Sequence, residues 1–257
     1  MIPKSGIFAT AIKVDMHPYH ENIEESNMFS EHSHLGNISE QLADMPEELD
    51  DPSLSKYIIA FFRDENEIHW CGSGVIVGNL IITAAHVMTE KKSKKNLPFL
   101  YFKFENSIRR IEEKDIIYDG RVRLIDEDEH NPHDLIVFKL SDISSPFVLN
   151  TFDFDIPLAV YARTYLEDKK STSGTTYKIV LKKGFRYDQY SLFNLESFEW
   201  HNCLLTTGNF ASGNSGTPVY RNNTIYGILI GETIHPDYHF RIFNFLDARF
   251  IQETISK

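Results

Sequence analysis

A succession of short β-rich runs starts near residue 57 and limits the folds that this chain can adopt. The runs are dominated by Ile, Val, Leu, Phe and Tyr, and turns separate them. Long helical patterns are missing between the runs, which favours an all-β fold of antiparallel barrels or a sandwich. The predicted strands are Tyr57–Phe62, His69–Val77, Leu80–Thr83, Phe99–Phe104, Asp115–Tyr118, Leu135–Leu140, Leu158–Ala162, Thr176–Leu181, Phe198–Thr206, Thr217–Tyr220, Thr224–Ile230 and His239–Phe245.

The strands fall into two sets. The stretch Ser141–Asp155 is polar at its start and has no clear strand pattern, so it marks the divide. After the second set, Asp247–Ser256 has helical spacing, with Phe250, Ile251 and Ile255 as an apolar stripe. We therefore expect two β-rich halves followed by a C-terminal helix.

The acidic residues gather before the first strand. The chain has a formal net charge of −11, from 26 Lys and Arg against 37 Asp and Glu. Eleven of the acids lie in residues 14–55, where there is no Lys or Arg, so the rest of the chain is formally neutral. We predict an acidic extension at 1–55 and a folded body at 56–257. A body without a basic excess argues against a nucleic-acid partner.

One uncharged run, Ile68–Thr89, is long enough to span a bilayer, but glycines and His86 interrupt it. Two buried strands joined by a turn at Val77–Asn79 explain the run better. We therefore expect no membrane partner.

The cellular compartment is predicted from two weaker signals. The N-terminus lacks an apolar stretch long enough for a secretory signal. The only cysteines, Cys71 and Cys203, either pair or are both free, and a reducing compartment is the simpler interpretation. We predict a cytoplasmic location.

Three short segments carry residues suited to nucleophilic catalysis. An apolar strand ends in small residues and then His86, Asp134 begins a second hydrophobic strand, and Ser215 lies between glycines before a third. A serine hydroxyl needs a base to accept its proton, and histidine is suited to accept and return a proton near neutral pH. An aspartate at the other ring nitrogen fixes the tautomer and stabilises the imidazolium.

The glycines beside Ser215 have a second use. They let the backbone turn tightly, so that the amides of Gly213 and Ser215 can face a developing oxyanion. His130 and His133 also lie just before Asp134, and we interpret both as surface-loop residues.

In these segments the chain resembles the chymotrypsin-like (trypsin-like) serine peptidase family. Thr83-Ala-Ala-His86 resembles that family's histidine motif, Asp134–Leu140 its aspartate strand, and Gly213-Asn-Ser-Gly216 its serine loop. The order His, Asp, Ser also belongs to this family, whereas α/β-hydrolases and subtilisins use other orders. The resemblance covers about residue 57 to the C-terminus.

The resemblance implies an architecture and a chemistry. It implies two six-stranded antiparallel β-barrels, at about 56–145 and about 150–246, with a C-terminal helix at 247–256. It implies a serine endopeptidase that acts on proteins or peptides through an acyl-enzyme, with His86, Asp134 and Ser215 as the catalytic residues. It implies no metal and no organic cofactor. The alternative is an inactive protease fold that serves as a binding or regulatory module.

Departures from the family narrow the subtype. Animal members place a half-cystine where Cys71 lies, but its partner would follow the histidine, where this chain has Val87. Trypsin-like zymogens pair a new N-terminal amine with an Asp before the serine, and the neutral Asn214 offers no such ion pair. Asn is usual there in the bacterial glutamyl endopeptidases and HtrA-type proteases. The tail resembles the first branch, and we expect no C-terminal PDZ domain.

The resemblance also indicates which residues form the substrate pocket. By resemblance, the pocket floor lies near Asn209 and Phe210, with walls from Leu229, Ile230 and Gly231. Nothing in that set matches the buried Asp that selects Lys or Arg. Glu232 is interpreted as a solvated surface residue.

A protease of this kind in a cytosol would be dangerous if always active. We therefore expect a restrained or narrowly specific enzyme, and by analogy a bacterial effector of antiviral defence. The acidic segment is a candidate prosegment, cleft cover or docking site for a regulatory partner, although a plain solvated extension is favoured over each of these.

Overall fold

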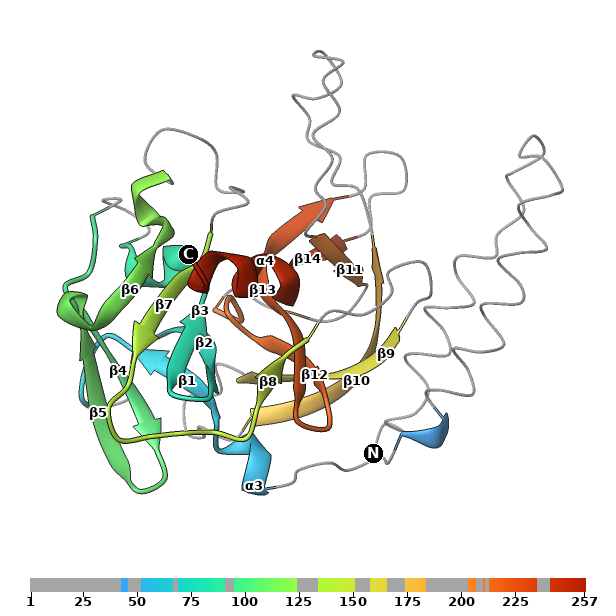
Figure 1. Cartoon of the computed structure of the whole chain (residues 1–257), viewed down its shortest axis with the longest axis horizontal. Helices are drawn as coiled ribbons and strands as arrows, with labels where there is room; N and C mark the ends of the chain where they lie inside the picture. The colour runs from blue at the N-terminus through green and yellow to red at the C-terminus, as the bar shows by residue number, and fades with distance from the viewer. Residues whose placement is uncertain are drawn as a thin grey trace, which may run out of the picture. The chain divides into compact units, whose positions relative to one another are not determined.

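The chain forms two β-sheets, one from each half, in a computed structural model (Figure 1). The structure describes residues 43–45, 52–66, 69–90, 95–123, 134–150, 158–165, 174–183, 203–206, 210, 213–234 and 241–257. The elements are α3 (Pro52–Ser55), β1 (Ile58–Phe62), β2 (Trp70–Val77), β3 (Leu80–Thr83), the 3₁₀ turn η1 (Ala85–Met88), β4 (Phe99–Phe104), β5 (Ser107–Glu112), η2 (Glu113–Asp115), β6 (Ile116–Asp119), η3 (Gly120–Arg123), β7 (Ile136–Lys139), β8 (Val148–Leu149), β9 (Leu158–Tyr165), β10 (Gly174–Lys183), β11 (Cys203–Thr206), β12 (Pro218–Arg221), β13 (Thr224–Ile234), β14 (Arg241–Asp247) and α4 (Ala248–Ile255). The predicted all-β, two-barrel fold is confirmed.

The first sheet has the strand order β5-β4-β1-β2-β3-β7-β6. Its β2–β3 hairpin turns at Gly78, whose φ of +54° suits glycine, and pairs Val77 with Leu80. This hairpin is the long uncharged run of the sequence, so its interpretation as two strands is confirmed. Large side chains such as Phe61, Phe102 and Phe138 are fully buried in this half.

The second sheet closes on itself. Its order is β12-β9-β10-β11-β14-β13-β8, and β12 also pairs with β13, so six strands form a ring. β8 is added outside the ring, parallel to β13. The core holds Val160, Leu181, Val219, Leu229 and Phe245, each under 5% exposed. Apolar side chains from alternate residues of these six strands thus fill the interior of the barrel.

Among the described residues, each sheet has one strand more than expected. β5 pairs with β4 across a turn at Glu105, whose φ is 55°, and Ile111 is the only buried residue of β5. It therefore lacks the apolar alternation that marks a strand in the sequence. β8 has only two residues, and Val148 N donates to the carbonyl oxygen of Asn223 at 2.9 Å.

The predicted C-terminal helix is α4, drawn in red in Figure 1. The Asp247 carboxylate caps it by accepting a hydrogen bond from Arg249 N at 2.8 Å. Ala248 and Ile251 are buried, and Gln252 Nε2 donates to the carbonyl oxygen of Leu149 at 2.7 Å. The helix contacts β13 and β14 of the second sheet and β6 of the first, so it joins both halves.

The division between an extension at 1–55 and a body at 56–257 stays a prediction, because residues 1–42 lie outside the described ranges. Met45, from the stretch assigned to the extension, is 3% exposed, and its carbonyl oxygen accepts a hydrogen bond from Lys178 Nζ at 2.5 Å. Within the described ranges, no helix is long and apolar enough to cross a membrane.

Candidate active site

His86 and Asp134 lie side by side at the edge of the first sheet. β3 ends at Thr83, Ala84 continues in extended conformation, and the chain then turns into η1, which carries His86. Asp134 immediately precedes the buried Leu135 and strand β7. Its Oδ1 accepts a hydrogen bond from His86 N at 2.9 Å, and its Oδ2 lies 2.6 Å from His86 Nδ1. Both carboxylate oxygens therefore hold the histidine.

The contact with the Asp134 carboxylate fixes which nitrogen of the His86 ring carries the proton. Asp134 is 1% exposed, whereas the His86 side chain is 31% exposed. An ionised carboxylate can only accept, so Nδ1 carries a proton and donates it, which leaves Nε2 of a neutral ring as an acceptor. Nε2 lies 2.7 Å from Ser215 Oγ. The serine hydroxyl thus donates to a ring that the aspartate has oriented.

The serine loop comes from the second sheet, but the first sheet supports it. Ser73 N in β2 donates to the Ser215 carbonyl oxygen at 2.7 Å. Gly216 has φ +85°, and a Cβ there would lie 1.8 Å from the Ser73 carbonyl oxygen and 2.3 Å from Thr83 Oγ1. Only glycine fits this close approach. Gly216 N donates to the Leu229 carbonyl oxygen at 2.7 Å, which ties the loop to β13.

Asn214 is fully buried, and its side chain faces the backbone of β9. Its Nδ2 donates to the Tyr165 carbonyl oxygen at 3.0 Å. A neutral amide satisfies this carbonyl without a counter-charge, in keeping with the expectation that no N-terminal amine pairs at this position.

The two amides predicted to bind an oxyanion are those of Gly213 and Ser215. Gly213 has φ +94°. Among the described residues, neither amide donates a hydrogen bond to a protein acceptor. Both donors therefore remain available to a ligand as far as the described residues go.

The predicted pocket residues differ in how deeply they are buried. Phe210 and Leu229 are 5% and 4% exposed and belong to the core of the second barrel, where the Phe210 ring lies 4.9 Å from that of Phe243. Ile230 is also buried, and Gly231 is half-buried. Asn209 lies outside the described residues. The substrate-binding role of this set stays a prediction.

Cys71 is a free thiol. Its Sγ donates to the Phe61 carbonyl oxygen at 3.4 Å, and burial raises its pKa to about 12. Next to it, a Cβ on Gly72 would lie 2.6 Å from the Val87 methyl groups. Tight packing therefore joins β2 to η1 where the resemblance would place a disulfide.

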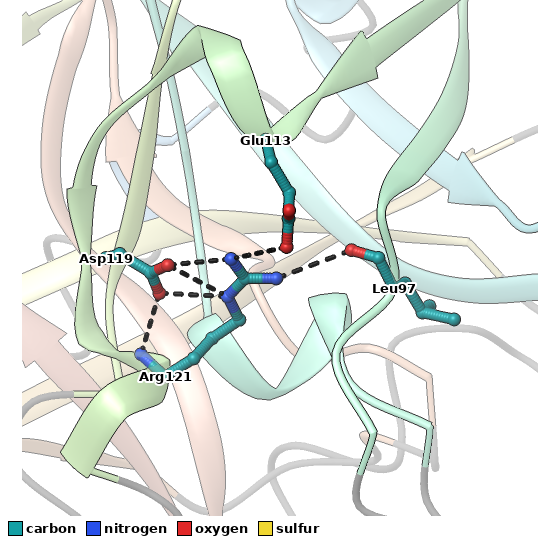
Figure 2. Close-up of polar contacts among 4 residues, drawn as sticks. All are labelled: Leu97, Glu113, Asp119 and Arg121. Carbon is teal, nitrogen blue, oxygen red and sulfur yellow. Dashed lines mark hydrogen bonds and ion pairs between the residues drawn. The ribbon is translucent and has the colours of Figure 1, made fainter.

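The buried Arg121 makes hydrogen bonds and ion pairs in η3, which lies beside the turn η1 that carries His86 (Figure 2). Arg121 Nε lies 2.9 Å from Asp119 Oδ1, and its Nη2 lies 2.7 Å from Asp119 Oδ2 and 3.2 Å from Glu113 Oε1. Its Nη1 donates to the Leu97 carbonyl oxygen at 3.4 Å. Burial alone would raise the pKa of Asp119, but the hydrogen bonds and charge of Arg121 outweigh burial and lower it.

The segments that hold this network are hydrogen-bonded to residues next to Asp134 and close to His86. η3, which holds Arg121, contacts η1. Gly120 N donates to the carbonyl oxygen of Leu135, the neighbour of Asp134, at 2.9 Å, and Leu97 N donates to that of Met88 at 2.7 Å.

The sequence analysis did not predict the supporting roles of three residues. Ser73 clamps the serine loop through its backbone, and Thr83 Oγ1 donates to the Ser73 carbonyl oxygen at 2.5 Å. Trp70 packs against Gly213. Thr83 was in view as part of the histidine motif, but no local signal links the other two to a loop so distant in sequence. Within the described ranges, no group of three His, Cys, Asp or Glu side chains is placed to hold a metal.

A two-barrel β fold with histidine, aspartate and serine in this order is the arrangement of the chymotrypsin-like serine proteases. The chain matches the family described as the trypsin-like peptidase domain over residues 72–231, and it belongs to this family. It is a serine endopeptidase, and its substrates are proteins or peptides. No curated protein matches the chain.

Three solved structures share the fold. The MamO protease domain from Magnetospirillum magneticum is 14% identical, with a TM-score of 0.51 and coverage of 78% of this chain and 96% of that one. Neuropsin, a serine protease of mouse brain, is 14% identical, with a TM-score of 0.53 and coverage of 79% and 96%. The Rv3671c protease, in an inactive form, is 12% identical, with a TM-score of 0.53 and coverage of 80% and 90%.

Proposed function

We propose that the protein cleaves peptide bonds through a Ser215–His86–Asp134 triad and an acyl-enzyme. The observation that carries this proposal is the continuous hydrogen-bonded chain from Ser215 Oγ through the imidazole to Asp134, with distances of 2.7 and 2.6 Å. Such a chain gives a serine hydroxyl the base that it needs at neutral pH.

In the acylation half, Ser215 Oγ forms a bond to the scissile carbonyl carbon, and its proton passes to His86 Nε2. The carbonyl π-electron pair moves onto oxygen, where the amides of Gly213 and Ser215 stabilise it. The carbon–nitrogen bond then breaks, and the departing amine takes the proton from Nε2. Loss of one oxyanion donor typically costs about 10²–10³ in rate.

In the deacylation half, water attacks the acyl carbon and gives its proton to Nε2. The carbon–Oγ bond breaks, the acid product leaves, and Ser215 Oγ recovers the proton. Asp134 remains ionised throughout and stabilises the imidazolium in both halves.

A fluorophosphonate probe tests the proposal directly, because it forms a covalent adduct with an activated serine. We expect the folded full-length protein to be labelled at Ser215, which peptide mapping identifies. The Ser215→Ala variant should lose the label, and Ser107→Ala, on the exposed strand β5, should keep it. A folded protein that is never labelled, even after removal of residues 1–55, would contradict the proposal and favour the inactive binding module.

The proposal extends to where and how the enzyme works. It is a cytoplasmic bacterial protease of the glutamyl-endopeptidase branch, either regulated or narrowly specific, and it serves as an effector in antiviral defence. The free Cys71 thiol supports a reducing compartment, and the passage of β14 directly into α4 supports the branch. General degradation of casein by the purified full-length protein would contradict the restraint.

A further inference from the structure

Trp70, at the start of β2, lies directly against the serine loop. A Cβ built on Gly213 would lie 2.9 Å from Trp70 Cζ3 and 3.1 Å from Cε3, so the indole face covers the Gly213 α-carbon. We propose that Trp70 is a positioning residue for the Gly213 amide, and through it for the oxyanion site. This inference rests on the proposed function.

The indole itself is firmly held. Its Nε1 donates to the Gly72 carbonyl oxygen at 2.7 Å, which fixes the orientation of the ring. Trp70 also packs against the buried residues Ala60, Phe62 and Tyr101, and Phe99 and Tyr165 pack against the same residues; we call this group the aromatic cluster. A ring with both a fixed hydrogen bond and packed neighbours can serve as a rigid wall.

Gly213 is less restrained by hydrogen bonds than the two residues that follow it. Asn214 is held by its hydrogen bond to Tyr165, and Ser215 by the bond from Ser73 N. Gly213 makes no hydrogen bond to any other described residue, and glycine has the widest choice of backbone conformations. The indole contact therefore limits a residue that local bonds leave unrestrained among the described residues.

The aromatic cluster reaches the loop by a second route. Tyr165 belongs to the second sheet, its hydroxyl donates to the Ile58 carbonyl oxygen in the first, and its own carbonyl accepts from Asn214. Trp70 thus contacts Gly213, and Tyr165 holds Asn214. The position of the oxyanion donors is thereby coupled to the docking of the two sheets.

The chemistry predicts a selective kinetic effect. The oxyanion forms in the transition state and not in the bound substrate, so a misplaced donor lowers kcat and leaves KM nearly unchanged. A general loss of folded protein would instead lower the active fraction, which titration of labelled serine measures separately.

The experiment compares Trp70→Ala, Trp70→Phe and Phe99→Leu, the last of which trims the same cluster. On a peptide ester, we expect kcat per labelled site to fall about 10–100-fold in Trp70→Ala with KM within about threefold of wild type. Trp70→Phe should recover most of the loss, because a flat ring still covers Gly213. Phe99→Leu should stay within about threefold of wild type.

A spectroscopic test uses the same residue. The chain has two tryptophans, so Trp200→Phe leaves Trp70 as the only indole. We expect its emission to shift when a peptide boronic acid, whose adduct places an oxygen among the oxyanion donors, binds Ser215. Unchanged emission on saturation would contradict the contact between Trp70 and an oxyanion-binding loop.

The two proposals fail in different ways. A wild-type protein that is neither labelled nor active contradicts the triad and, with it, the role of Trp70. An active wild type whose folded Trp70→Ala variant keeps its kcat within twofold contradicts only the role of Trp70.

Discussion

At the scale of single residues, the site depends on Gly213 and Gly216, two glycines near Ser215 whose different roles the sequence does not reveal. Glycines near a nucleophile were expected to allow a tight turn. What the sequence could not reveal is that Gly216 faces a backbone carbonyl of another strand, because that contact arises only when the two sheets meet.

We predict that Gly216→Ala destabilises the protein by at least about 2 kcal/mol, since backbone strain and a steric clash add together. Fluorophosphonate labelling of Ser215 should be lost with it. Gly78→Ala is the matched control, because Gly78 also has positive φ, at +54°, but has nothing within 4 Å of a Cβ. It should cost only about 1 kcal/mol and keep the label. Urea unfolding measures both, and equal costs would contradict the clash.

At the scale of elements, prediction succeeded where a strand consists mainly of buried apolar residues. The bounds of β3 and β4 agree with the sequence analysis, and α4 begins at Ala248, one residue after the predicted start at Asp247. β5 was not predicted, because it is held in the sheet by its pairing with β4 and not by burial of its side chains. The network around Arg121 was not predicted either, because the partners of Arg121 come from three separate segments of the chain.

The Arg121 network predicts a pH-dependent contribution to stability. The pKa of Asp119 is lowered in the folded state, so the ion pair contributes fully above the unfolded pKa of about 4 and is lost as pH falls through the folded value. Asp119→Asn should cost about 1–2 kcal/mol at pH 7, since Asp119 is partly exposed, and the deficit should shrink toward pH 3. Urea midpoints across this range measure it.

The control for this prediction is Asp142→Asn, which breaks an ion pair with Arg109 between two more exposed side chains. It should cost less than about 0.5 kcal/mol at pH 7. A deficit in Asp119→Asn that stays constant with pH would show that packing, and not charge, explains the effect.

At the scale of the whole molecule, the order of histidine, aspartate and serine was enough to predict the family and the meeting of the three residues. The contacts that hold the sheets together could not be predicted, because residues such as Tyr165 and Ser73 have no local pattern that names a distant partner. The same holds for α4, whose existence was predicted but whose contacts with both sheets were not.

We predict that Ile251→Ala weakens the molecule as a unit. Ile251 is fully buried in α4, which contacts both sheets, so its truncation should cost about 2–4 kcal/mol. Glu253→Ala, on the exposed side of the same helix, should change stability by less than about 0.5 kcal/mol. Thermal and urea unfolding measure both variants, and a cost for Ile251→Ala no larger than the control would contradict the buried role of the helix.

The two sheets also divide the chemistry between them. His86 and Asp134 come from the first half, and Ser215, 129 residues after His86, comes from the second. A ribosome therefore finishes the base long before it makes the nucleophile, and the nascent chain stays inert until the second barrel closes. For the same reason, a chain divided between β8 and β9 is a natural split reporter. Each fragment lacks half of the proton relay, and complementation alone restores it.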